Sequence, residues 1–155
     1  MGLAMEYIIT DGRNEDFITL CRMLDEHLNE AVGGEKQREQ YNQYNTLESI
    51  HDVILLYDQG LPIACAGFKH HDEGVAEVKR VFLKKEYRGR GLSKELMKHL
   101  EARAKDRGYR KLVLETGAVL KEAMSLYQKL GYEIIENYGP YRCMCGSVCM
   151  SKLLL

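Results

Sequence analysis

A turn rich in glycine and arginine is the clearest chemical signal in this sequence. The turn, Arg88-Gly89-Arg90-Gly91-Leu92-Ser93, follows the apolar run Val81-Phe82-Leu83 and precedes a long helical pattern. The first amides of a helix lack partners within the helix and carry partial positive charge, and glycine lets the backbone close around an anion. The two arginines and Lys94 add charge-assisted hydrogen bonds. The turn predicts a site for a phosphorylated ligand; a basic turn that merely caps a helix is the alternative.

Two familiar phosphate-binding motifs do not fit this turn. A nucleoside-triphosphate P-loop ends in Gly-Lys-Ser or Gly-Lys-Thr, and that ending is absent here. A dinucleotide fold needs a third glycine, whereas the stretch Gly89-Arg90-Gly91-Leu92-Ser93-Lys94 has lysine in that position. The turn also follows a pattern typical of an antiparallel meander, not one that opens a parallel sheet. Both ligand classes are therefore disfavoured.

The turn resembles the central motif of the GNAT superfamily of N-acetyltransferases, Q/R-x-x-G-x-G/A. Arg88, Gly91 and Ser93 stand at its three defined positions. Serine in the last position crowds the turn slightly, but its hydroxyl can reach a phosphate. The resemblance runs from Leu55 to the C-terminus, and the residues before it match only as helices in the right order. It implies a single α/β (mixed α+β) domain over residues 1–155, with a central mixed sheet of about six or seven strands and about four flanking helices.

The same resemblance implies the ligand and the reaction. Acetyl-CoA would be the co-substrate, no metal would be needed, and a small-molecule primary amine would attack directly in a ternary complex. The turn residues Arg88, Gly89, Arg90, Gly91, Leu92 and Ser93 would bind the pyrophosphate. Main-chain groups of Val81, Phe82 and Leu83 would contact the pantetheine arm, and an N–H near Val81 would polarise the thioester carbonyl.

Two catalytic side chains follow from the resemblance. Members of the family often carry a tyrosine on the later helix that protonates the leaving thiolate, and Tyr127 in Leu126-Tyr127-Gln128 holds that place. A phenol pKa of about 10 suits proton donation to a thiolate leaving group. Core packing is the alternative interpretation of Tyr127. Histone-type members carry a general-base glutamate where Glu77 stands. A structural glutamate paired with Lys79 or Arg80 is the other interpretation of Glu77.

The C-terminal third contains the candidate acceptor residues. Leu114-Glu115-Thr116-Gly117 and the tail Tyr138-Gly139-Pro140-Tyr141-Arg142 are similar to bacterial small-molecule acetyltransferases. Tyr141 and Arg142 would then lie at the substrate end, where an arginine can bind a carboxylate through two hydrogen bonds; an exposed loop is the alternative. His70 and His71 are interpreted as a solvated hairpin tip.

Hydrophobic periodicity predicts the elements that position these residues. Amphipathic helices are expected over residues 14–30, 92–107 and 120–130. The first of them should begin at the N-cap Asn14 and end at Gly33-Gly34. The stretch 35–49 is either a short helix or a loop. Alternation predicts that Glu77, Lys79 and Val81 share one face of a strand and that Val78, Arg80 and Phe82 share the other. The other strands are expected over residues 7–10, 53–57, 63–70, 111–115, 132–135 and 147–153.

Bulk composition excludes several classes of protein. A net charge of −1 gives no basic field for nucleic acid or membrane, and no apolar run approaches the length of a bilayer-spanning helix. The N-terminus does not read as a signal peptide, so a cytoplasmic location is expected. The five cysteines, an odd number, are interpreted as reduced thiols. A metal site on Cys143, Cys145 and Cys149 would have an unfamiliar spacing.

The identity of the acceptor stays open at this level. A lysine side chain or N-terminal amine of a protein is the first alternative to a small molecule. A regulatory module that binds CoA without turnover is the second alternative. A homodimer formed through the C-terminal strands is a further hypothesis.

Overall fold

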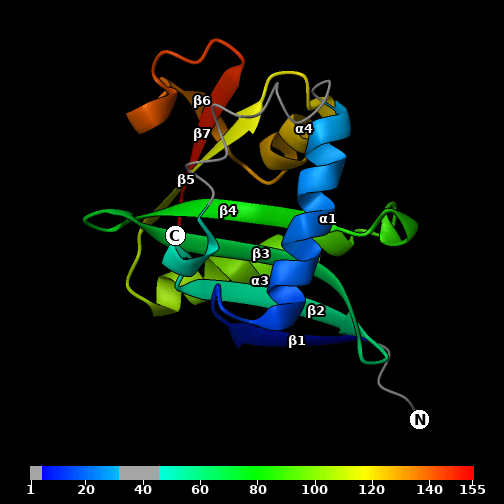
Figure 1. Cartoon of the computed structure of the whole chain (residues 1–155). Coiled ribbons are helices and arrows are strands. Elements are labelled where there is room, and N and C mark those ends of the chain that lie inside the picture. The colour runs from blue at the N-terminus through cyan, green and yellow to red at the C-terminus, as the bar shows by residue number, and fades with distance from the viewer. Residues whose placement is uncertain (1–4, 32–45) are drawn as a thin grey trace.

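The fold is a seven-stranded mixed sheet with helices on both faces (Figure 1). The computed structural model describes residues 5–31 and 46–155. The strand order β1-β2-β3-β4-β5-β7-β6 is antiparallel throughout except for the parallel pair β4 and β5, which confirms the predicted mixed sheet. The strands are β1 (Met5–Thr10), β2 (Asp52–Asp58), β3 (Leu61–Asp72), β4 (Val75–Leu83), β5 (Lys111–Gly117), β6 (Glu133–Ile135) and β7 (Ser147–Leu153).

Three α-helices lie within the described residues, each close to its predicted range: α1 (Glu15–Ala31), α3 (Leu92–Asp106) and α4 (Lys121–Lys129). The Asn14 side chain caps α1 by accepting a hydrogen bond from the Phe17 N–H at 3.0 Å, as predicted. Most of the stretch 35–49 and the Gly33-Gly34 end of α1 lie outside the described residues. The final part of the stretch 35–49, Leu47–Ser49, is a 3-10 turn. Two further 3-10 turns are Lys85–Tyr87 and Gly139–Tyr141. No helix in the described ranges is long and apolar enough to span a membrane.

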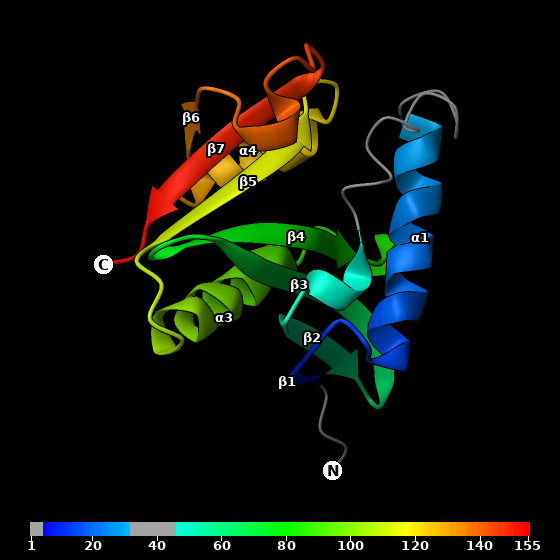
Figure 2. The ribbon, with the colours of Figure 1, turned by 60° about the vertical axis from the view of Figure 1, so that its left-hand side comes forward.

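The two helix-covered faces hold separate cores. Leu96, Met97 and Leu100 of α3 pack with Tyr127 of α4 on one face. Phe17, Leu20 and Cys21 of α1 pack on the other. Figure 2 shows α1 and α3 on opposite sides of the strands β2 to β4. Because β4 is covered on both faces, most of its side chains are buried.

The parallel strands β4 and β5 pair over a short length and then diverge. Their register covers only Val75 to Glu77 against Lys111 to Val113, and Figure 2 shows the two strands spreading apart beyond that point. The part of β4 from Val78 to Leu83 therefore has β3 beside it but no ladder to β5. Main-chain N–H and C=O groups along such an edge need partners other than a neighbouring strand.

A β-bulge in β4 overturns the predicted alternation. Lys79 pairs with Gly67 and Phe82 with Cys65, so Arg80 and Val81 together stand opposite the single residue Ala66. Arg80 has a φ of 60°. The extra residue reverses the order of faces, and Phe82 packs into the α1 core while Val78 packs into the α3 core. The prediction that Val78 and Phe82 share a face is therefore wrong. The prediction that Val81 shares a face with Glu77 and Lys79 is also wrong, because Val81 packs against the α3 core beside Val78.

The other predicted strand boundaries differ only at their ends. The hairpin between β3 and β4 turns at Glu73 and Gly74, because β3 continues through Asp72. His70 and His71 are exposed near this tip, as predicted. The hairpin tip still contacts the rest of the molecule, because the ring of His71 meets the ring of Tyr138 at a centroid distance of 4.8 Å.

A buried carboxylate ties the start of β2 to the end of α3. Asp52 is 2% exposed and accepts hydrogen bonds from Arg103 Nε at 2.7 Å and Arg107 Nε at 3.2 Å. Arg103 bonds Oδ1, whereas Arg107 bonds Oδ2, and His51 Nδ1 lies 2.6 Å from that same Oδ2. Burial alone would raise the pKa of Asp52, but the hydrogen bonds from His51 and Arg103 and the charge of Arg107 bring that pKa below its ordinary value.

We predict that Asp52→Asn lowers the free energy of unfolding by about 2 kcal/mol at neutral pH, because three cationic or polar partners lose one carboxylate. The pKa of Asp52 is lower in the folded than in the unfolded chain, so its contribution is present at neutral pH and is lost as the pH falls below about 4. Urea unfolding at pH 7 and at pH 3.5 measures both effects. Asp106→Asn is the control, because Asp106 is an exposed carboxylate on α3, next to Arg107 in the sequence. Equal unfolding midpoints for the two variants at pH 7 would show that Asp52 does not stabilise the fold through its partners.

Candidate functional site

The predicted phosphate-binding turn lies between the end of β4 and the start of α3. Gly89 and Gly91 have φ values of 82° and 73°, and Gly91 is the N-cap residue of α3. No side chain of the described residues caps this helix start, so its first amides are left for an external acceptor. A Cβ built on Gly91 would meet nothing within 4 Å among the described residues. The strand, turn and helix predicted here are confirmed, and the turn can receive an anion.

The side chains of Arg88 and Arg90 are exposed, and neighbouring groups of the protein orient them. Arg88 Nε donates to the Leu83 carbonyl at 3.2 Å. The Arg90 guanidinium lies 5.2 Å from the centre of the Tyr87 ring, whose hydroxyl donates to Asp58 Oδ2 at 2.7 Å. A guanidinium that is oriented in this way needs less ordering when it binds an anion. The turn thus combines helix amides with two positioned arginines.

Main-chain groups beside the turn come from the unpaired edge of β4. Val81 follows the bulge at Arg80, and Phe82 and Leu83 pair with Cys65 and Ala64 of β3 on the opposite side. The side chains of Phe82 and Leu83 are buried, so these residues can offer an extended ligand only their main chain. This placement suits the predicted contact with a pantetheine arm.

The Arg80 side chain anchors the bulge to α1. Its Nη2 donates to the Cys21 carbonyl at 2.8 Å and lies 2.9 Å from Asp25 Oδ1. The Cys65 thiol in turn donates to the Arg80 carbonyl at 3.2 Å. The bulge is therefore fixed by contacts from both neighbouring elements, and Arg80 has partners other than Glu77.

Tyr127 is buried in the core between α4 and the sheet. Its side chain is 7% exposed, and its ring packs edge-on against Tyr132 at a centroid distance of 5.7 Å. Burial raises the pKa of the Tyr127 phenol above its ordinary value. The phenol therefore carries its proton at neutral pH, but it is a weaker acid than a free phenol, so the pKa match to a thiolate that the sequence suggested is not kept. The packing that the alternative interpretation expected is also observed, and the catalytic role stays a prediction.

Glu77 lies at the point where β4 and β5 begin to diverge, and it is 5% exposed. It accepts a hydrogen bond from the Tyr138 hydroxyl at 2.7 Å. Lys79 Nζ lies 3.7 Å from the same oxygen and donates to the Tyr141 hydroxyl at 3.0 Å. The pairing with Lys79 that was one interpretation of Glu77 is thus present. A base function for Glu77 stays a prediction.

The two predicted acceptor residues have different surroundings. Tyr141 is buried against Lys79, so the exposed-loop alternative is wrong for its side chain. Arg142 is exposed and lines an open hollow of about 640 Å³ together with Glu136, Asn137 and Tyr138. The Asn137 side-chain amide holds the loop by donating to three of its carbonyls, those of Tyr141, Met144 and Ser147.

Sequence reasoning named Lys79 only as a structural partner of Glu77 and missed Tyr138 as a residue of this site. The Lys79 pairing could be predicted because residues 77 and 79 of a regular strand point to the same face. Tyr138 carries no such local signal, because it reaches Glu77 across 61 residues of sequence. Only the folded chain brings it there.

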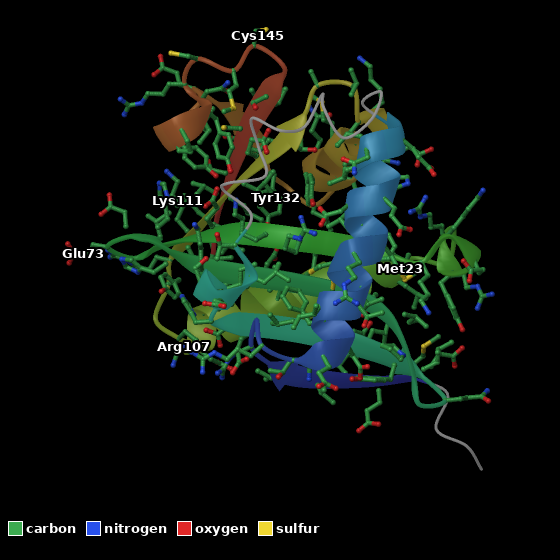
Figure 3. All side chains as sticks on the ribbon, viewed as in Figure 1. Met23, Glu73, Arg107, Lys111, Tyr132 and Cys145 are labelled. Atoms are coloured by element: carbon green, nitrogen blue, oxygen red, sulfur yellow. The ribbon has the colours of Figure 1, made fainter. Side chains whose placement is uncertain are left out.

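The C-terminal cysteines do not gather at one point. Cys143 and Cys145 are exposed, whereas Cys149 is buried on β7. Figure 3 shows Cys145 at the outer end of the loop that precedes β7, and Tyr132 further inside near the sheet. Within the described part of the chain, no three His, Cys, Asp or Glu side chains are grouped to hold a metal ion.

Comparisons with known proteins agree with this geometry. The profile of the Acetyltransferase (GNAT) family matches residues 15–132. The uncharacterized N-acetyltransferase YsnE of Bacillus subtilis is 30% identical over 92 residues, which cover 58% of this chain and 61% of YsnE. The chain spans about half the length of the curated relatives it matches.

Solved structures match this chain over nearly the full length of both proteins. A Klebsiella pneumoniae protein described as an acyl-CoA N-acyltransferase has a TM-score of 0.77 at 30% identity and covers 96% of this chain and 98% of its own. The PaiA N-acetyltransferase of Thermoplasma acidophilum, solved in complex with coenzyme A, has a TM-score of 0.73 at 20% identity, with coverage of 97% and 99%.

Proposed function

The chain belongs to the acetyltransferase (GNAT) family, and we propose that it transfers the acetyl group of acetyl-CoA to the primary amine of a small molecule. The observation that carries the proposal is the uncapped α3 start with Gly91 as N-cap, at the end of a strand whose edge is open beyond Glu77. The left-handed glycines leave room for a diphosphate, so the residues present fit the co-substrate.

Binding is assigned to the turn and to the β4 edge. The α3 amides and the guanidinium groups of Arg88 and Arg90 hold the diphosphate. The main chain of Val81, Phe82 and Leu83 aligns the extended arm along β4. An N–H of the bulge near Val81 donates to the carbonyl oxygen, which gains negative charge during attack. The acetyl thioester, when bound, supplies the activated carbonyl.

The proton transfers are assigned to two buried side chains. Glu77 accepts a proton from the acceptor ammonium group, directly or through a water molecule, which frees the nitrogen lone pair. The new bond forms between that nitrogen and the acetyl carbon, and the carbon–sulfur bond breaks. Tyr127 donates its phenolic proton to the departing sulfur and is reprotonated by the second proton that the nitrogen loses as it becomes the amide, while Glu77 releases its proton to solvent. Positioning both partners in one site supplies much of the rate.

A thiol-release assay tests the reaction. Purified protein is mixed with acetyl-CoA and a library of small amines, and in parallel with lysine-containing peptides and peptides with free N-termini. We expect amine-dependent thiol release with small molecules. Release with peptides alone would replace the small-molecule proposal by the protein-acceptor alternative, and CoA binding without release from any amine would favour a regulatory module.

We predict that Glu77→Gln lowers kcat by about 100-fold or more, because glutamine keeps the shape and hydrogen bonds of the side chain but cannot accept the proton. Glu101→Gln is a matched control, since Glu101 accepts from Tyr132 at 3.0 Å and from Lys152 at 2.9 Å in a similar arrangement. Steady-state kinetics with a saturating amine measures kcat. Equal kcat values for the two variants would remove Glu77 as the base.

A further inference from the structure

Glu77 and Lys79 present two opposite charges side by side in a buried position. They lie two residues apart on the α1 face of β4, ahead of the bulge, and are 5% and 8% exposed. The Glu77 Oε2 to Lys79 Nζ distance of 3.7 Å is too long for a hydrogen bond. A buried ion pair offsets its loss of hydration only when hydrogen bonds complete both partners. The two charges are therefore incompletely satisfied by each other.

The shortage of hydrogen-bond partners is clearest at the Lys79 ammonium group. Burial lowers the pKa of this group, although the carboxylates of Glu77 and Glu115 act in the opposite direction and Lys69 acts with burial. The Lys79 ammonium has three donor hydrogens, and Tyr141 accepts one of them. A further carboxylate beside Lys79 would stabilise its charge and accept a remaining donor.

The position of the pair suits an acceptor molecule. Glu77 is the last β4 residue paired with β5, so the pair lies where the sheet opens. Tyr138 bonds to Glu77 and also lines the open hollow with Arg142. The hollow and the ion pair therefore share one side chain, so the buried charges lie directly behind a residue that borders the hollow.

We propose that Glu77 and Lys79 together bind a zwitterionic acceptor, with its ammonium group at Glu77 and its carboxylate at Lys79, so that the substrate is an α-amino acid or a compound with the same head group. A single carbon separates the two charged groups of such a molecule, which suits two side chains on adjacent same-face positions. A zwitterion adds no net charge to a cluster that already contains two lysines, one arginine and two glutamates. This inference rests on the proposed function, in which Glu77 takes the proton of the same amine.

The test compares three forms of each acceptor in the thiol-release assay. The probes are L-α-amino acids, their amides, and the amines that lack the carboxylate, for example L-leucine, L-leucine amide and isopentylamine. We expect the best amino acid to exceed its amide and its amine by roughly 10- to 100-fold in kcat/KM. In Lys79→Met, the KM of the amino acid should rise by about that factor while the KM of the amine stays within about twofold.

Several controls separate this inference from other outcomes. Lys69→Met removes a neighbouring cation and should keep the preference, and CoA titration shows whether each variant is folded. Tyr141→Phe keeps the lysine but removes its partner, and should weaken the preference in part. If Arg142→Met rather than Lys79→Met removes the preference, or if wild type uses amides as well as acids, the inference is overturned. CoA binding without thiol release from any probe would instead overturn the proposed function.

Discussion

Gly91→Val is expected to weaken CoA binding by at least about 100-fold. Gly91 has a φ of 73°, which a β-branched residue adopts only with strain. Its missing Cβ also faces open space at the start of α3, where the diphosphate is proposed to lie. A valine would both distort the turn and fill that space. A loss of about 100-fold corresponds to about 2.7 kcal/mol, and calorimetric titration with CoA measures it.

The other end of the same helix offers a matched control. Gly108 has a φ of 91° and equally open surroundings within the described structure, so Gly108→Val has a similar backbone strain far from the turn. Both variants should lose some thermal stability, but only Gly91→Val should bind CoA more weakly than the wild type. Undiminished CoA affinity in a folded Gly91→Val protein would contradict the assignment of the turn.

Tyr127→Phe is expected to lower kcat by roughly 100- to 1,000-fold while the Kd of CoA stays unchanged. The ring and its contact with Tyr132 remain, so the core keeps its packing. What is lost is the proton of a phenol whose pKa is raised by burial and which therefore stays protonated at neutral pH. Steady-state kinetics and a CoA titration on the same preparation separate the two quantities.

The neighbouring tyrosine tests whether this effect is specific. Tyr132 is also buried and donates its hydroxyl to Glu101 at 3.0 Å, so Tyr132→Phe removes a structural hydrogen bond from the same core. It should lower stability and leave kcat close to that of wild type. If the two phenylalanine variants turn over at the same rate, core packing is the better interpretation of Tyr127.

Local patterns of the sequence were enough to locate the described helices, most strands and the glycine-rich turn that is proposed to bind phosphate. The turn could be recognised because its parts are neighbours in the chain: an apolar strand, two left-handed glycines and a helix start lie within residues 81–92. The cap at Asn14 is equally local, since its bond spans three residues. Features of this kind depend on backbone chemistry that each residue carries with it.

The surroundings of the candidate catalytic residues depended on tertiary contacts. The Tyr138–Glu77 and Lys79–Tyr141 bonds cross 61 and 62 residues of sequence, and the Arg80–Cys21 bond crosses 59. The bulge at Arg80 is the sharpest case, because alternation along β4 predicted the wrong face for the residues after it. A strand register is set by its neighbours, here β3 and the helix α1 that accepts the Arg80 side chain.

The sequence by itself therefore determined where the glycine-rich turn and the helix start lie, and which elements flank them. Only the tertiary structure decided that β4 and β5 part beyond Glu77, that Lys79 and Tyr138 contact that glutamate, and that Tyr141 bonds the lysine. The physical reason is the range of the interactions involved. Helix starts and glycine turns are determined by adjacent residues, whereas sheet order, strand divergence and buried polar pairs exist only when distant segments pack together.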